Sequence, residues 1–212
     1  MIRLDGRTLT ESRPIKIQDN IIFSASSSVQ LSIGSTTLIV AIFKSEKKKK
    51  HNKKLKIEID SFEQISKTEI RSLCKITTEV ILQENLKFFP EYELTINVFV
   101  VENDGNLLIV LLNAISQSLK RIKLYKSKEI IFSGIGLNHK NNEFYIDPSK
   151  FESEFLKEEI YFAFIFDVQT QKIRFYQIAK LTTNYLENNK FDKNKLKKLI
   201  CEFGFYLYKI FN

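Results

Sequence analysis

A tight turn that leads into an apolar helix is the first feature of the sequence able to bind an anion. A strand expected at 92–102 is followed by the turn Asn103-Asp104-Gly105 and by a helix expected at about 106–121. The first N–H groups of a helix have no partner within it, and the helix dipole adds partial positive charge there. The turn is therefore a candidate phosphate site. Asp104 itself is expected to serve the turn, because Asn, Asp and Gly tolerate its backbone angles.

Acidic residues are the second possible source of chemistry. Four glutamates gather in and just after the polar stretch 148–158: Glu152, Glu154, Glu158 and Glu159. With lysines to hold phosphate, such carboxylates could serve acid–base catalysis.

Other reactive residue types form no catalytic or metal-binding pattern. Asp5 and Glu11 lie near the N-terminus, where we expect a salt-bridged or solvated role. His51 lies in a lysine-rich loop and His139 in a polar turn, and neither has the neighbours of a triad or a metal site. We therefore predict no metal and no cofactor.

Composition and apolar run lengths argue against a disordered chain and against membrane-spanning helices. Of the 212 residues, 43% are hydrophobic and 12% aromatic, which is enough for a core and argues against global disorder. The longest apolar runs, 107–112 and 160–166, are far shorter than the roughly 20 residues of a membrane helix, and the N-terminus has no secretory pattern. Cys74 and Cys201 lack metal-ligand spacing and are expected to be reduced, core or half-buried thiols of an intracellular protein.

Positive charge is concentrated in one predicted loop at 44–54. The formal net charge is +8, and six of these charges come from the run KKKKHNKK, which contains Lys47, Lys48, Lys49, Lys50, Lys53 and Lys54. A focused basic loop attracts phosphate backbones, so these lysines are candidate RNA contacts. A solvated insertion is the alternative, and the run is also typical of a nuclear localisation signal.

The spacing of apolar residues predicts a mixed α/β (α+β) fold. Its β-rich N-terminal half has strands at 13–18, 21–25, 27–33, 36–43 and 55–60. The rest has the order β-α-β-β-β-β-α, with strands at 92–102, 130–138, 143–147, 160–167 and 172–179.

Helical periodicity and end signals place the other elements. Apolar residues from Ile65 to Ile81 recur at three- to four-residue steps and predict a helix at 62–88 that Pro90 closes. Asp192 is a good N-cap for a last helix that runs to the C-terminus. Because no linker or repeat divides the chain, we predict a single domain over 1–212.

Three stretches in this order resemble the RNase PH family. Residues 3–14 are similar to its opening R-x-D-G-R … E-x-R-P, with Arg3, Asp5, Gly6, Arg7, Glu11, Arg13 and Pro14 matching. Residues 26–43, SSSVQLSIGSTTLIVAIF, resemble its second hairpin. Residues 98–117, VFVVENDGNLLIVLLNAISQ, resemble its strand, glycine turn and helix. The resemblance implies a fold that assembles into six-membered rings, as in phosphorolytic RNA-trimming enzymes and exosome ring subunits.

The same resemblance implies that the active site is degenerate. Active members carry a phosphate-binding arginine three residues after the first glycine of the turn, and Leu108 stands at that position. Aligning the family's acidic motif on Asp147 places Glu152 at its glutamate, and Ser153 and Glu159 at its two active-site aspartates. The sequence at 146–154 resembles instead the D-P-T stretch of catalytically silent ring subunits. These subunits are of the mRNA-transport-regulator and ribosomal-RNA-processing types.

We therefore expect a non-catalytic subunit of the exosome core ring. The expected partners are other RNase PH-like ring subunits, cap subunits and RNA, with no membrane, in the nucleus (nucleolus) and cytoplasm. One alternative is an active phosphate-dependent 3'-5' exoribonuclease that uses the glutamates at 152–159. Another is a free-standing RNA-binding protein that uses the lysine loop. If the site is degenerate, the turn at 103–105 reverses the chain without binding phosphate. The helix after it then buries Leu107, Leu108, Val110, Leu111 and Ile115.

Overall fold

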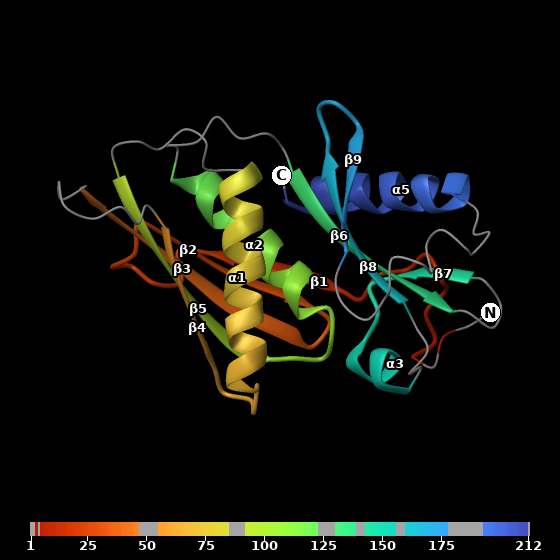
Figure 1. The fold of residues 1–212 in the computed structure, drawn as a ribbon, viewed down its shortest axis with the longest axis horizontal. Helices are drawn as coiled ribbons and strands as arrows, with labels where there is room; N and C mark the ends of the chain where they lie inside the picture. Colours follow the sequence, from red (N-terminus) through yellow and green to blue (C-terminus); the bar gives the residue numbers. More distant parts are fainter. Residues whose placement is uncertain are drawn as a thin grey trace. The chain divides into compact units, whose positions relative to one another are not determined.

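The computed structural model describes residues 3, 5–46, 55–84, 92–122, 130–138, 143–155, 160–177 and 193–211 (Figure 1). The chain divides into two compact units. The middle unit is Pro14–Lys128, and the terminal unit combines Met1–Arg13 with Glu129–Asn212. The prediction of a single domain over 1–212 stays a prediction, because two compact units fit either one domain or two.

The described part of the middle unit consists of a five-stranded sheet and two helices. Its strands lie in the order β1-β2-β3-β5-β4, with bounds Ile15–Asp19, Ser27–Ile33, Thr36–Glu46, Tyr92–Glu102 and Leu55–Ser61. All neighbours are antiparallel except β4 and β5, which are parallel. One row of β-branched side chains crosses four strands in register: Val29, Val40, Val98 and Ile59. Each of them is buried, so this row forms part of the core.

Helix α2 (Leu107–Arg121) packs on β2 and β3, and α1 (Lys67–Glu84) packs on β4 and α2 (Figure 1). Every residue of α2 from Leu107 to Leu119 is buried, including Asn113 and Ser118. The five apolar residues predicted to be buried in α2 are therefore confirmed as core. Ser118 meets Ser27 of β2 at 3.0 Å between their hydroxyl oxygens, which satisfies two buried polar groups.

The predicted start of α1 was wrong by five residues. The helix begins at Lys67 rather than at 62, because Ser66 caps it: the Ser66 hydroxyl accepts the N–H of Glu69 at 3.1 Å. The helical spacing of apolar residues already includes Ile65, so this spacing alone does not show where the helix starts. Pro90, the predicted stop, lies outside the described residues.

The strand predicted at 21–25 was also wrong, since this segment forms a turn between β1 and β2. The Ile22 N–H donates to the Ser28 hydroxyl at 2.8 Å, and the Ala25 N–H donates to the Ile22 carbonyl at 3.2 Å. These local hydrogen bonds use the backbone groups that a sheet ladder would need. As a result Phe23 is 97% exposed.

In the terminal unit, the described residues form a four-stranded antiparallel sheet with two helices. The strand order is β7-β6-β8-β9, with bounds Glu143–Ile146, Ile130–Asn138, Ile160–Asp167 and Lys172–Gln177. Helix α3 (Lys150–Phe155) follows β7, and α5 (Lys193–Phe211) packs on the sheet (Figure 1). Gly204 allows the close approach of α5, because a Cβ there would lie 2.4 Å from Cδ1 of the buried Phe166. The last helix is thus confirmed, while its predicted cap Asp192 lies outside the described residues.

These elements confirm a mixed α+β fold. The two cysteines are free and half-buried, as predicted. No helix in the described part of the chain is long and apolar enough to cross a membrane.

Candidate functional site

The turn before α2 is fixed by hydrogen bonds to β3, to the segment after β4 and within itself. The Thr36 hydroxyl donates to the Gly105 carbonyl at 2.7 Å and accepts the Asp104 N–H at 2.9 Å. The Gly105 N–H donates to the Asn103 side chain at 3.2 Å, and the Asn103 N–H donates to Glu63 at 2.9 Å. Three consecutive N–H groups are therefore already bonded within the protein. These bonds hold the turn in place and thereby position the start of α2.

Backbone angles explain why these residue types stand in the turn. Gly105 has φ +91° and Asn106 has φ +58°, in the left-handed region that glycine and asparagine tolerate best. The sequence interpretation of Asn103-Asp104-Gly105 as turn chemistry is confirmed by these hydrogen bonds and angles.

Leu108 lies in the first turn of α2 and is 6% exposed. Its side chain carries neither charge nor hydrogen-bond donor, and its neighbours Leu107 and Ile109 are also buried. The position that the resemblance aligns with a phosphate-binding arginine is therefore apolar and buried here.

A buried cluster of arginines and carboxylates organises the terminal unit. Arg3 is 8% exposed and donates from Nε to Glu152 Oε1 at 2.6 Å and from Nη2 to Glu152 Oε2. It also donates to the carbonyls of Ile146 at 2.7 Å and Asp147 at 3.0 Å. Its guanidinium lies 5.1 Å from the ring centre of Tyr145, a cation–π distance. Arg3 thus fastens the N-terminal segment to β7 and α3.

The pair between Arg13 and Asp147 is the second centre of the cluster. Asp147 is fully buried, and Arg13 is 5% exposed. Arg13 binds both carboxylate oxygens, from Nε at 2.9 Å and from Nη2 at 2.8 Å, and its backbone N–H donates to the same carboxylate at 2.9 Å. Bidentate geometry of this kind is the strongest form of the arginine–carboxylate contact. Asp147 also has φ +49°, a conformation that aspartate tolerates better than most residues.

Arg7 joins the two centres near the surface. It donates from Nε to Asp5 at 2.7 Å, and its guanidinium lies 3.5 Å from the Asp147 carboxylate and 3.6 Å from that of Glu152. Asp5 is therefore salt-bridged, which confirms its predicted role. Glu11 accepts the Thr8 N–H at 2.7 Å, so it also supports the local fold.

Electrostatics hold Glu152 in its charged form. Burial raises the pKa of this carboxyl, but the hydrogen bonds from Arg3 and the Ser149 N–H, with the charges of Arg3 and Arg7, outweigh burial and lower it. The pKa of Asp5 is lowered in the same way, against burial, by its bonds to Arg7. An ionised carboxylate whose oxygens are already bound is poorly suited to give or take a proton.

Several predicted site residues lie beyond what the structure describes. Ser153 and Glu154 lie in α3, but at these two positions the structure describes the backbone alone, so nothing follows about their side chains. The remaining candidates are outside the described residues: Glu158, Glu159, His51, His139 and the lysines Lys47, Lys48, Lys49, Lys50, Lys53 and Lys54. Among the described residues, no group of three or more His, Cys, Asp or Glu side chains is placed to hold a metal ion.

Sequence reasoning missed the roles of Arg3, Arg13, Asp147 and Glu152 as partners. The partners lie 134 to 149 residues apart, so no local pattern pairs them. The available signal was that all four match family motifs, two arginines near the N-terminus and two carboxylates at 147–152.

Comparison with known proteins identifies the family of this chain. The sequence model for the 3' exoribonuclease family, domain 1 (RNase PH), matches residues 11–124, more than half of the chain. That range contains the turn and α2. No curated protein matches the chain at a significant level.

Solved structures match almost the whole chain. Rrp46 from rice (Oryza sativa) aligns with a TM-score of 0.72 and 19% identity, over 99% of this chain and 95% of that one. A chain of an archaeal exosome core has a TM-score of 0.66 and 16% identity, over 99% and 91%. A chain of the Archaeoglobus fulgidus exosome with RNA bound to the active site has 0.65 and 16%, over 100% and 93%.

At these identities the structural matches establish the fold, and they confirm the expected RNase PH-like arrangement of strands and helices. Together with the match of the family's sequence over residues 11–124, they show that this chain belongs to the 3' exoribonuclease, or RNase PH, family.

Proposed function

We propose that this chain is a non-catalytic RNase PH-like subunit of an exosome-type core ring. Its role would be to complete the ring, to scaffold 3'-5' RNA processing and degradation by a separate nuclease, and to help guide RNA through the channel. The observation that carries the proposal is the apolar, buried Leu108 at the position of the phosphate-binding arginine.

Phosphorolysis places strong demands on the missing groups. Inorganic phosphate must be held beside the scissile phosphodiester, and the charge that develops must be stabilised by placed cations and donors. The helix dipole at α2 supplies about 0.3–1 kcal/mol at an exposed site, which is well below a bidentate arginine contact. Loss of a single such donor commonly lowers kcat by about 10²–10³.

The acidic positions support the same proposal. By the family alignment, Ser153 replaces one active-site aspartate and Glu159 replaces the other with a longer side chain. Glu152 is bound by Arg3 through both oxygens, so it is not free to replace them. This contact also weighs against the alternative of an active exoribonuclease built on the glutamates at 152–159.

The proposed partners follow from the fold and from the matched structures. Those matches are named as Rrp46 and as chains of archaeal exosomes, one of them with RNA bound. We propose that this chain contacts other RNase PH-like ring subunits, cap subunits and RNA, and that the lysine loop at 44–54 contributes to RNA contact. We also propose that it occurs in the nucleus, including the nucleolus, and in the cytoplasm.

A phosphorolysis assay tests the lack of catalysis. The purified chain is incubated with single-stranded RNA and inorganic phosphate, and released nucleoside diphosphates are measured. We expect none above the level of a phosphate-free control. Release that requires phosphate and disappears in Glu159→Gln would instead establish the alternative of an active exoribonuclease.

A further inference from the structure

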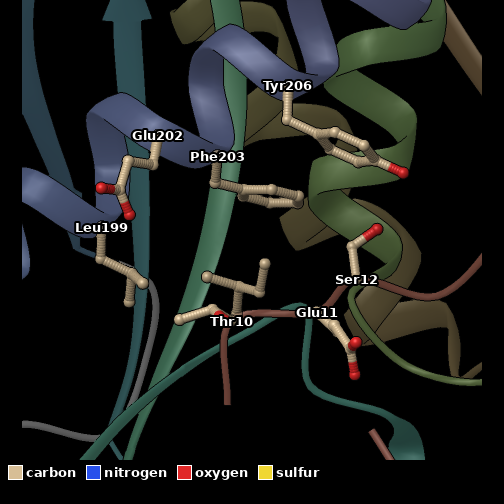
Figure 2. A pocket seen from close by; sticks show the side chains of 8 residues that line it. Thr10, Glu11, Ser12, Leu199, Glu202, Phe203 and Tyr206 are labelled. Carbon is tan, nitrogen blue, oxygen red and sulfur yellow. The ribbon is translucent and has the colours of Figure 1, made fainter. Parts of the chain in front are cut away.

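A pocket of about 260 Å³ lies within the terminal unit, between residues 10–12 and helix α5. Figure 2 shows Leu199, Glu202, Phe203 and Tyr206 along α5 on one side, and the N-terminal segment on the other. The volume is slightly below the roughly 300–1,000 Å³ of pockets for drug-sized ligands. It is suited to a single inserted side chain rather than to a larger molecule.

Two stacked aromatic rings form the centre of the pocket. The rings of Phe203 and Tyr206 have centroids 6.2 Å apart and planes inclined by 19°. Phe203 is 4% exposed, whereas Tyr206 is 47% exposed. The accessible aromatic surface therefore belongs mainly to Tyr206, with Phe203 packed behind it. Aromatic surfaces attract cations, arginine more often than lysine.

Two glutamates line the pocket, one from α5 and one from the N-terminal segment. Figure 2 shows Glu202 on α5 and Glu11 on the N-terminal segment, with the Phe203 ring between them. No Lys, Arg or His is among the described residues that line the pocket. Ser12 adds a hydroxyl group on the side of Glu11.

Among the described residues, the arginines near the pocket pair with other carboxylates, and the one lysine contact is weak. Arg3 and Arg7 donate to the main-chain carbonyl of Glu11, at 3.3 and 3.1 Å, and pair their charges with other acids. Lys198 lies 3.8 Å from Glu202, but both side chains are more than half exposed, so this pair is weak. The pocket thus combines an apolar centre with acidic edges.

We propose that this pocket binds an arginine side chain from a basic segment of a partner protein. The guanidinium would pack against the Phe203–Tyr206 pair between the carboxylates of Glu202 and Glu11. Arginine fits better than lysine, because its planar group stacks on rings and pairs with carboxylates in a fixed geometry. The inference goes beyond the proposed function, since it rests on the terminal unit alone and holds whether or not the chain is catalytic.

NMR titration of the full-length, ¹⁵N-labelled chain tests the proposal. The probe is the capped peptide Ac-Gly-Gly-Arg-Gly-Gly-NH₂, and the matched neutral peptide has Gln in place of Arg. We expect the arginine peptide to give saturable shifts at Thr10, Glu11, Ser12, Glu202 and Phe203, and the glutamine peptide to give none. Glu202→Gln should weaken binding about fivefold, whereas Glu79→Gln, at an exposed glutamate of α1, should leave it unchanged.

Three results would overturn the proposal. The first is the absence of saturable shifts at these residues, and the second is equal binding of the two peptides. The third is a response of the same residues to oligo(U) RNA and not to the arginine peptide, which would identify the pocket as a nucleic-acid contact. Tyr206→Leu separates the contributions, because it removes the stacked ring at an exposed site while keeping both carboxylates, and it should also weaken binding.

Discussion

Replacing Asp147 with asparagine removes the carboxylate that the buried Arg13 guanidinium binds. Asparagine keeps the size of the side chain and tolerates the φ of +49°, so the change isolates the loss of charge. Asp147 is fully buried and Arg13 is 5% exposed, so the arginine would remain charged with little access to water. Breaking a buried ion pair from one side destabilises a protein by about 3–5 kcal/mol. For a chain of this size we expect a fall in Tm of about 6–20 °C.

Thermal and urea unfolding, followed by circular dichroism, measure this loss. The matched control is Asp5→Asn, which breaks a more exposed pair with Arg7 and should cost at most about 1 kcal/mol. The double variant Arg13→Met/Asp147→Asn should lose less than the sum of its single variants, because it no longer leaves an unpaired buried charge. A loss below about 1 kcal/mol in Asp147→Asn, or equal losses in Asp147→Asn and Asp5→Asn, would refute the account of the cluster.

Three further predictions concern packing, pH and RNA. Gly136→Ala should destabilise the chain by about 1–3 kcal/mol in urea unfolding, because the new Cβ would lie 2.2 Å from the ring of Tyr145 on the paired strand; an unchanged midpoint would contradict this. The lowered pKa of Glu152 stabilises the fold fully above its ordinary value of 4.5, and this stabilisation is lost as pH falls through the folded-state pKa. Glu152→Gln should therefore make the free energy of unfolding fall less steeply with pH in the acid range. Equal slopes in the variant and the original chain would contradict this prediction. If the lysine loop binds single-stranded RNA, log Kd against log salt should have a slope of magnitude about 4, and serine at 47–50 should lower it; an unchanged slope would show that the loop makes no such contact.

Much of the fold could be predicted from local patterns, because strands and helices leave periodic traces in sequence. The row from Val29 to Ile59 and the buried length of α2 follow from β-branched alternation and from an apolar run after a turn. The errors came where short side-chain contacts override periodicity. Ser28 captures a backbone N–H and turns 21–25 away from the sheet, and Ser66 sets the start of α1.

The candidate site also has features that the sequence could predict and features that it could not. The burial of Leu108 could be predicted because it lies in the apolar run after the turn, whereas its role as a lost phosphate contact stays a prediction from the family motif. The cluster around Asp147 could not be predicted, because its residues pair with arginines that lie 134 residues or more before them in the sequence. The pocket beside α5 was equally hidden, since Glu11 and Glu202 come from opposite ends of the sequence.

Native mass spectrometry of the tagged chain, purified from its own cells, tests the central claim most directly. A non-catalytic ring subunit should appear in one large assembly together with several distinct RNase PH-like chains. A homohexamer of this chain would contradict the account, because a ring of identical subunits would have to carry its own active site. A bare monomer would also contradict it and would leave RNA binding as the function to examine.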